Sequence, residues 1–199
     1  MLDALKGNLQ ARAAIALTYF GGFRPGEVRG LRWEDYELVP VFNGEHEEPT
    51  YEWQLTPRRS IWHTETTPKT EERSVRPVVV IEPLRTILAE LRKADGNPQT
   101  GPILCGPSGK PLNLDNLSRR IIGPTLKAAG IAWRGFYTQR HGLAQRLRYK
   151  TGDVLAESAV LRHTPEVAQA HYIGAVEEAA RKGMHMIEQE AMAAIAKKT

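Results

Sequence analysis

Residues that can bind phosphate stand near the start of this 199-residue sequence. Arg24 precedes Pro25, which suits the first position of a helix, so its guanidinium can add to the positive end of the helix dipole. Lys69 lies in a polar turn between two strand-like runs, as if at the tip of a hairpin. A lysine there is either a solvent-facing edge residue or a mobile cation that reaches over a substrate. Taken alone, each of these cations is more often an ordinary surface residue.

Two further groups occur in the second half of the chain. Tyr137, Arg140 and His141 are spaced so that they share one face of a helix, although a basic amphipathic helix explains them equally well. His163 and Tyr172 lie nine residues apart in "LRHTPEVAQAHYIGA". A tyrosine in such a helix more often packs in the core with its hydroxyl at the surface. None of these positions identifies a function by itself.

Composition narrows the class of protein. The formal charge of +4 and the isoelectric point near 9.3 lean weakly toward an anionic partner. The only cysteine, Cys105, excludes an internal disulfide and suits a reducing compartment. No apolar run approaches membrane-spanning length, and the N-terminus has no signal-peptide core. We therefore expect a soluble cytoplasmic protein with no membrane partner.

Hydrophobic periodicity indicates which elements hold these residues. Between Tyr36 and Ile81 the runs "YELVPVF", "YEWQLT", "SIWHTE" and "SVRPVVVI" have the β-branched and aromatic content of strands. Elsewhere the apolar spacing is helical. The expected helices are 8–20, a short one from Pro25, 83–96, 113–129, 137–150, 154–162, 165–173 and an apolar-striped tail from Val176. This predicts an α+β fold, mainly α-helical, with a small antiparallel sheet near the N-terminal third packed on a helical domain.

The order and spacing of the motifs resemble the tyrosine recombinase (phage integrase) family over roughly residues 9–175. "GGFRPGEVRGLRWEDYEL" is similar to its first arginine box, and "PKTEERSVRPVVV" to its catalytic-lysine hairpin. "YTQRHGLA" is similar to its histidine-x-x-arginine-histidine box, and "LRHTPEVAQAHY" to its closing histidine-to-tyrosine segment.

The resemblance implies site-specific DNA recombination, by strand cleavage and rejoining through a 3′-phosphotyrosyl intermediate. Arg24 and Arg140 would clamp the scissile phosphate, Lys69 would protonate the leaving 5′-oxygen and His163 would bind a phosphate oxygen. Tyr172 would be the nucleophile. Neither a metal nor another cofactor is expected, because the arginines supply the transition-state stabilisation.

Two positions depart from the family pattern. Tyr137 stands where the family usually has histidine; it can donate a hydrogen bond to phosphate but is a poor base near pH 7. Tyr137 is still expected to be one of the catalytic residues. Arg162 replaces the usual glycine before His163, where it either contacts DNA or caps the helix end.

The resemblance also predicts the domain organisation and partners. Residues 1–175 would form the catalytic domain and 176–199 a helical tail, with the family's N-terminal core-binding domain absent. Double-stranded DNA would be the partner. The tail would mediate self-association on DNA or pack on its own domain. Two alternative functions remain: a type IB topoisomerase-like activity, and a catalytically weak or inactive DNA-binding integrase remnant.

Overall fold

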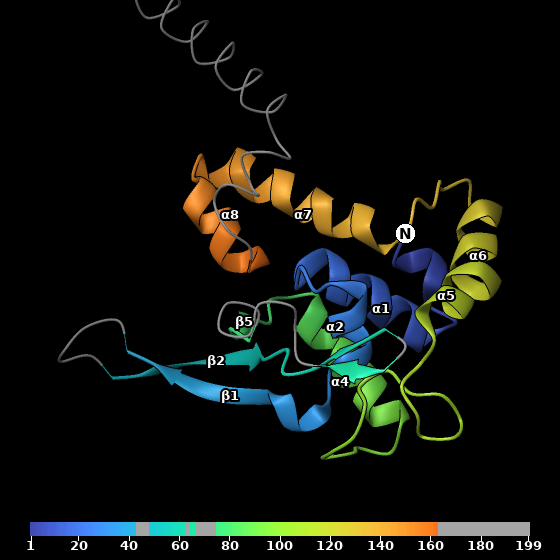
Figure 1. The fold of residues 1–199 in the computed structure, drawn as a ribbon, viewed down its shortest axis with the longest axis horizontal. Helices are drawn as coiled ribbons and strands as arrows, with labels where there is room; N and C mark the ends of the chain where they lie inside the picture. The colour runs from blue at the N-terminus through green and yellow to red at the C-terminus, as the bar shows by residue number, and fades with distance from the viewer. Residues whose placement is uncertain (43–47, 63, 67–74, 163–199) are drawn as a thin grey trace, which may run out of the picture.

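The fold is built around α1 (Leu9–Phe20), which lies between α4 (Leu84–Ala94) and α7 (Phe136–Thr151) (Figure 1). The computed structural model describes residues 1–42, 48–62, 64–66 and 75–162. Small alanines surround Ile15 and Leu17 on α1, and both of these larger residues are buried. A helix that is apolar on nearly all sides must be covered on nearly all sides. The alanines permit helices to approach α1 closely from both directions.

The helices expected from the sequence within the described residues are confirmed. α4 buries the predicted stripe of Leu84, Ile87, Leu88 and Leu91. α7 is followed by α8 (Val154–Leu161), whose N-cap Asp153 accepts a bond from the backbone N–H of Leu155. The other helical segments are the 3₁₀ turns Asp3–Leu5 and Trp33–Asp35, then α2 (Pro25–Gly30), α5 (Leu114–Leu117), the π-helical turn Ser118–Ile122 and α6 (Gly123–Ala128). The predicted helices 165–173 and 176 onward lie outside the described residues.

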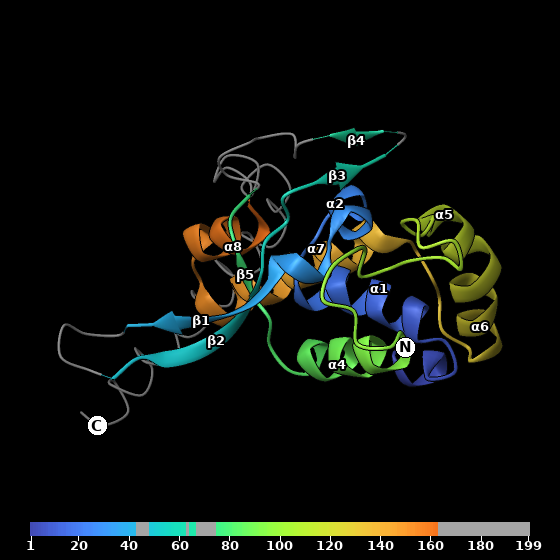
Figure 2. The same ribbon diagram turned by 90° about the horizontal axis from the view of Figure 1, so that it is seen from below.

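The strands form two separate antiparallel groups where the sequence predicted one sheet. β1 (Tyr36–Val41), β2 (Thr50–Leu55) and β5 (Val78–Val79) pair in the order β1-β2-β5. β3 (Ser60–Ile61) pairs instead with β4 (Glu65–Thr66), and Figure 2 shows this pair beside α2, away from the β1–β2 arm.

The separation follows from the chain after β2. Pro57 has no backbone N–H to continue the ladder, and a turn bond from Arg58 N to Thr56 O redirects the chain. The run "SIWHTE", predicted as a strand, therefore contributes two short strands joined by a turn. Lys69, predicted at the tip of a hairpin, lies outside the described residues. β4 before it and β5 after it pair with different strands.

The three-stranded sheet is attached to the helical core through its last two strands. Leu55 on β2 and Val78 on β5 are buried, as is Val80 immediately after β5. They belong to the same hydrophobic cluster as α1 and α4. The predicted α+β class, with a small sheet packed on a helical domain, is confirmed. Among the described residues, no helix has the length and apolar character that would let it cross a membrane.

Two glycines let β3 approach α2, the helix that follows Arg24. A Cβ at Gly26 would lie 2.6 Å from the Ser60 hydroxyl oxygen. A Cβ at Gly30 would lie 2.4 Å from the Arg59 carbonyl oxygen, so it would meet rigid backbone. The absence of a side chain at Gly30 is thus a condition of this packing.

Gly30→Ala is expected to lower the free energy of unfolding by about 1–3 kcal/mol, because the added methyl forces α2 and β3 apart. Gly7→Ala is the matched control, since a Cβ there meets nothing within 4 Å. Its effect should stay within about 0.5 kcal/mol. Urea denaturation of the three proteins measures both values. Equal stabilities for the two variants would contradict the close α2–β3 contact.

Candidate active site

Arg24 is the N-cap of α2 and is held there by a single carboxylate. Its backbone is extended, and Pro25 occupies the first helical position as predicted. Glu27, one turn later, accepts from Arg24 N at 2.8 Å and from Arg24 Nη1 at 2.6 Å. Arg24 Nη2 donates to the carbonyl oxygen of Arg162 at 3.2 Å. The side chain keeps 29% of its surface exposed, so a fixed guanidinium still faces solvent.

Arg140 reaches the same place from α7. It is buried, and its Nη1 and Nη2 donate to the carbonyl oxygens of Gly22 and Leu161. These two carbonyls belong to the turn before α2 and to the last residue of α8. The structure therefore brings together the two arginines that the motifs singled out. His141, predicted on the same face as Arg140, is exposed while Arg140 is buried.

Arg162 completes the cluster from the end of α8. Its backbone N–H donates to Ser158 O, which caps the helix. Its side chain is fully buried, with Nη2 2.7 Å from Glu27 Oε2 and the guanidinium 4.9 Å above the Phe23 ring. Of the two roles predicted for Arg162, the helix cap is confirmed, and complete burial excludes the DNA contact.

The cluster holds three guanidinium groups and one carboxylate, so it has a surplus of positive charge. Burial raises the pKa of Glu27, but the charges of Arg162 and Arg24 outweigh this and leave it below its ordinary value. Burial, followed by repulsion from Arg24 and Arg162, lowers the pKa of Arg140 to about 9. Arg140 thus stays charged at neutral pH. A surplus of buried, hydrogen-bonded cations favours the binding of an anion.

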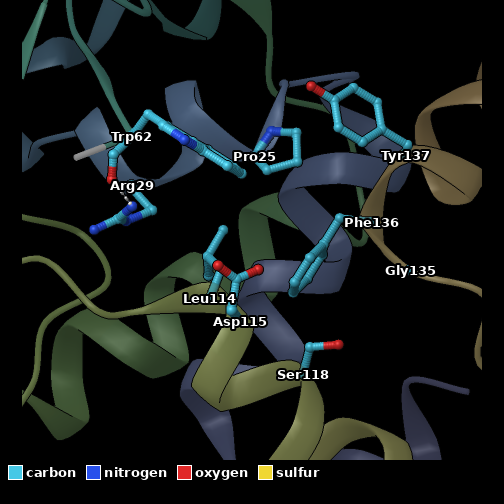
Figure 3. Close-up of a pocket in the computed structure, with 9 residues that line it drawn as sticks. All are labelled: Pro25, Arg29, Trp62, Leu114, Asp115, Ser118, Gly135, Phe136 and Tyr137. Atoms are coloured by element: carbon cyan, nitrogen blue, oxygen red, sulfur yellow. Dashed lines mark hydrogen bonds between the residues drawn. The ribbon is translucent and has the colours of Figure 1, made fainter.

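Tyr137 lies at the start of α7 and is 57% exposed. It lines a pocket of about 260 Å³ together with Pro25, which directly follows Arg24. Figure 3 shows the Tyr137 ring beside Pro25; Phe136 and Leu114, which are both buried, line the same pocket. Tyr137 therefore lies at a pocket that borders α2, next to the residue that follows Arg24.

Three expected catalytic residues, Lys69, His163 and Tyr172, lie outside the described residues. Glu27 and the side chain of Arg162 are parts of the site that sequence reasoning missed. A signal for Glu27 existed, because an acid three residues after an N-cap is a capping-box pattern. Arg162 gave no such signal, since its partner Glu27 lies 135 positions away.

Comparison with known proteins gives a consistent result at the level of fold. No protein-family model and no curated protein sequence matches the chain. Among solved structures, the Tn1549 transposon integrase in complex with transposon right end DNA matches with a TM-score of 0.70 at 17% identity, over 94% of this chain and 62% of that one. XerA recombinase matches with a TM-score of 0.60 at 15% identity, over 84% and 53%.

XerH site-specific recombinase bound to difH substrate matches with a TM-score of 0.60 at 20% identity, over 90% of this chain and 49% of that one. This chain has the fold of a tyrosine recombinase catalytic domain. The resemblance to tyrosine recombinases that the sequence motifs predicted is therefore confirmed for the fold. The chain spans about half to two thirds of the length of these recombinases.

Glu27→Gln is expected to lower the free energy of unfolding by about 3 kcal/mol at neutral pH, because it leaves buried arginines without a counter-charge. The folded pKa of Glu27 is lowered from its ordinary 4.5. The stability it contributes is therefore present above 4.5 and is lost as the pH falls through the folded value. Guanidinium denaturation at pH 7 and about pH 3 should show a smaller difference from wild type at the acid pH.

Asp35→Asn is the control for this experiment. Asp35 is also buried beside two arginines, Arg58 and Arg59, but burial outweighs their charges and raises its pKa. Its contribution is therefore present at low pH and is lost as the pH rises through the raised value. The two variants should differ from wild type with opposite pH trends. A Glu27→Gln effect that is independent of pH would contradict the charge role of Glu27.

Proposed function

We propose that this chain is the catalytic part of a site-specific DNA recombinase, which cuts and rejoins double-stranded DNA through a 3′-phosphotyrosyl intermediate. The observation that carries the proposal is the convergence of Arg24 and Arg140 in a cluster with surplus positive charge. The fold is that of solved recombinases, and one of them, the Tn1549 transposon integrase, was solved in complex with transposon right end DNA. We place this activity in the cytoplasm.

The two arginines suit a phosphodiester because they are fixed before the substrate arrives. A phosphodiester resists attack, since its own negative charge repels nucleophiles and increases on its oxygens in the transition state. Guanidinium groups that are already oriented stabilise this charge without reorganisation. Arg24 is held by Glu27 and by the carbonyl oxygen of Arg162, and Arg140 by two carbonyls. This arrangement requires no metal ion to bind the phosphate.

The remaining catalytic roles follow from the motif positions. Tyr172 gives its phenolic proton to water and attacks the phosphorus. The bond from phosphorus to the 5′-oxygen breaks, and Lys69 supplies a proton to the leaving oxygen. His163, joined by a peptide bond to Arg162, hydrogen-bonds a phosphate oxygen. The phosphotyrosyl bond conserves the energy of the broken phosphodiester, so attack by a 5′-hydroxyl rejoins the strands without ATP. Residues 1–175 would carry this chemistry, and the tail 176–199 would mediate self-association on DNA.

Tyr172→Phe is expected to abolish covalent protein–DNA adducts while DNA binding is retained, because only the phenolic oxygen is lost. The substrate is a library of nicked duplexes, and SDS-resistant adducts are counted on gels. Tyr51→Phe is the matched control, since it removes an exposed phenol from β2 and should leave the adduct yield unchanged. An adduct that persists in Tyr172→Phe would assign the nucleophile to another residue.

Two other results with the wild-type protein would support the alternative functions. DNA binding without adducts in the wild-type protein would identify an inactive DNA-binding remnant. Relaxation of supercoiled plasmid by the monomer, without exchange between two duplexes, would identify topoisomerase-like activity. These assays use the same protein preparation and separate cleavage, strand exchange and binding.

Tyr137→Phe is expected to slow adduct formation by roughly 2- to 10-fold, the effect of losing one hydrogen bond to phosphate. Tyr137→His should accelerate it near pH 7, because imidazole can accept the proton of the nucleophile. Melting temperatures measured in parallel separate chemistry from folding. A silent Phe variant together with a slower His variant would show that Tyr137 only packs at the pocket edge.

A further inference from the structure

Arg162 has a backbone conformation that an arginine does not favour. Its φ of +55° lies in the left-handed region, where a Cβ crowds the backbone. At a helix end this conformation is usually taken by glycine or asparagine. In the described ranges the other non-glycine residue with positive φ is Asn97, which suits that region. Capping alone therefore does not explain an arginine at this position.

The side chain of Arg162 connects the supports of the two phosphate-binding arginines. Its Nη2 lies 2.7 Å from Glu27 Oε2 and 3.4 Å from Gly22 O. Glu27 is the carboxylate that holds Arg24, and Gly22 O is the carbonyl that accepts from Arg140. The carbonyl oxygen of Arg162 itself accepts from Arg24. One residue thus contacts Arg24 directly and supports both Arg24 and Arg140 through shared acceptors.

We propose that Arg162 is a positioning residue, which fixes the Glu27 carboxylate and thereby sets the orientation of Arg24 relative to Arg140. It takes no direct part in binding DNA, because none of its side chain is exposed. The catalytic consequence of this role depends on the proposed function, but the positioning of Glu27 does not.

The physical reason is that Glu27 must bind two guanidinium groups at once. Its Oε2 accepts from both Arg24 N and Arg162 Nη2, while its Oε1 accepts from Arg24 Nη1. Without the Arg162 guanidinium, Oε2 loses its charged partner, and the carboxylate is held only by the residue that it is meant to orient. Arg24, part of which faces solvent, is then free to turn away from Arg140.

Arg162→Gly separates this role from helix capping. Glycine adopts the left-handed backbone freely and keeps the N–H that caps α8, so a pure cap would leave adduct formation unchanged. Positioning predicts slower adduct formation, by roughly 10-fold as for lost outer partners at other charged sites. The rate at saturating DNA should carry the loss, with DNA affinity nearly unchanged. Arg162→Lys keeps the charge and should recover part of the rate.

A third variant, Arg162→Met, removes the guanidinium group, and Arg59→Met is its control. Arg59 also pairs with a buried carboxylate, Asp35, that has a second arginine partner, and it lies outside the cluster. Melting temperatures show which variants are folded at the assay temperature. If Arg162→Met is unfolded there, the Gly and Lys variants decide the question. Adduct rates for Arg162→Gly equal to those of wild type would overturn the proposal.

A second measurement does not require activity. Carbon-13 NMR of the glutamate carboxyls gives the Glu27 titration in the wild-type protein and in each variant. Glu27 faces Arg24 from α2, Arg140 from α7 and Arg162 from the end of α8, and Arg162 is the strongest of the charges that lower its pKa. Its pKa should rise in Arg162→Gly and Arg162→Met and remain unchanged in Arg59→Met.

When the rate of adduct formation is plotted against pH, the fall on the acid side should move to higher pH in Arg162→Gly and Arg162→Met. An unchanged Glu27 titration would overturn the proposal whatever the activity. If the wild-type protein forms no adduct, the proposed function fails, and the Glu27 titration still tests the contact between Arg162 and this carboxylate.

Discussion

The Glu27 carboxylate allows two arginines to be buried close to a third. Like charges withdrawn from water repel one another strongly, and each loses its hydration. Glu27 offsets part of this cost by binding Arg24 and Arg162, while backbone carbonyls of Gly22 and Leu161 satisfy Arg140. The remaining positive charge is the feature that suits the site to an anionic substrate. Without this carboxylate the convergence of α2, α7 and α8 would be electrostatically unfavourable.

The rest of the fold serves to hold those three helices in place. α1 is apolar around most of its surface, so it supports α7 on one side and α4 on the other (Figure 1). Gly26 and Gly30 let β3 pack against α2, which holds the helix behind Arg24. The site thus depends on rigid elements, and its arginines are oriented before any ligand is present. Such preorganisation is the main source of electrostatic catalysis.

Two buried carboxylates in this protein illustrate how environment decides charge. Asp35 and Glu27 are each almost fully buried, and each pairs with two arginines. Burial dominates at Asp35 and raises its pKa, whereas at Glu27 the charge of Arg140 adds to those of Arg162 and Arg24 and the pKa is lowered. The two carboxylates differ in their neighbours: the backbone N–H of Arg24 also donates to Glu27 and lowers its pKa, whereas the nearby negative charge of Glu34 adds to the rise at Asp35. A buried carboxylate paired with arginines therefore has a structural role at Asp35, whereas at Glu27 it belongs to the charged site.

The sequence by itself determined the features that depend on local spacing. A period of about 3.6 residues identified the helices, β-branched and aromatic content identified the strand-rich region, and motif order identified the recombinase fold and the pair of Arg24 and Arg140. Only the tertiary structure decided that "SIWHTE" forms a separate two-stranded pair, that Arg162 is buried and that Glu27 joins the cluster. Glu27 and Arg162 are 135 positions apart, so their ion pair exists only because the helices pack as they do. Hydrophobic periodicity carries no information about such a contact, because it describes each element and not the partner against which a charged side chain finally rests.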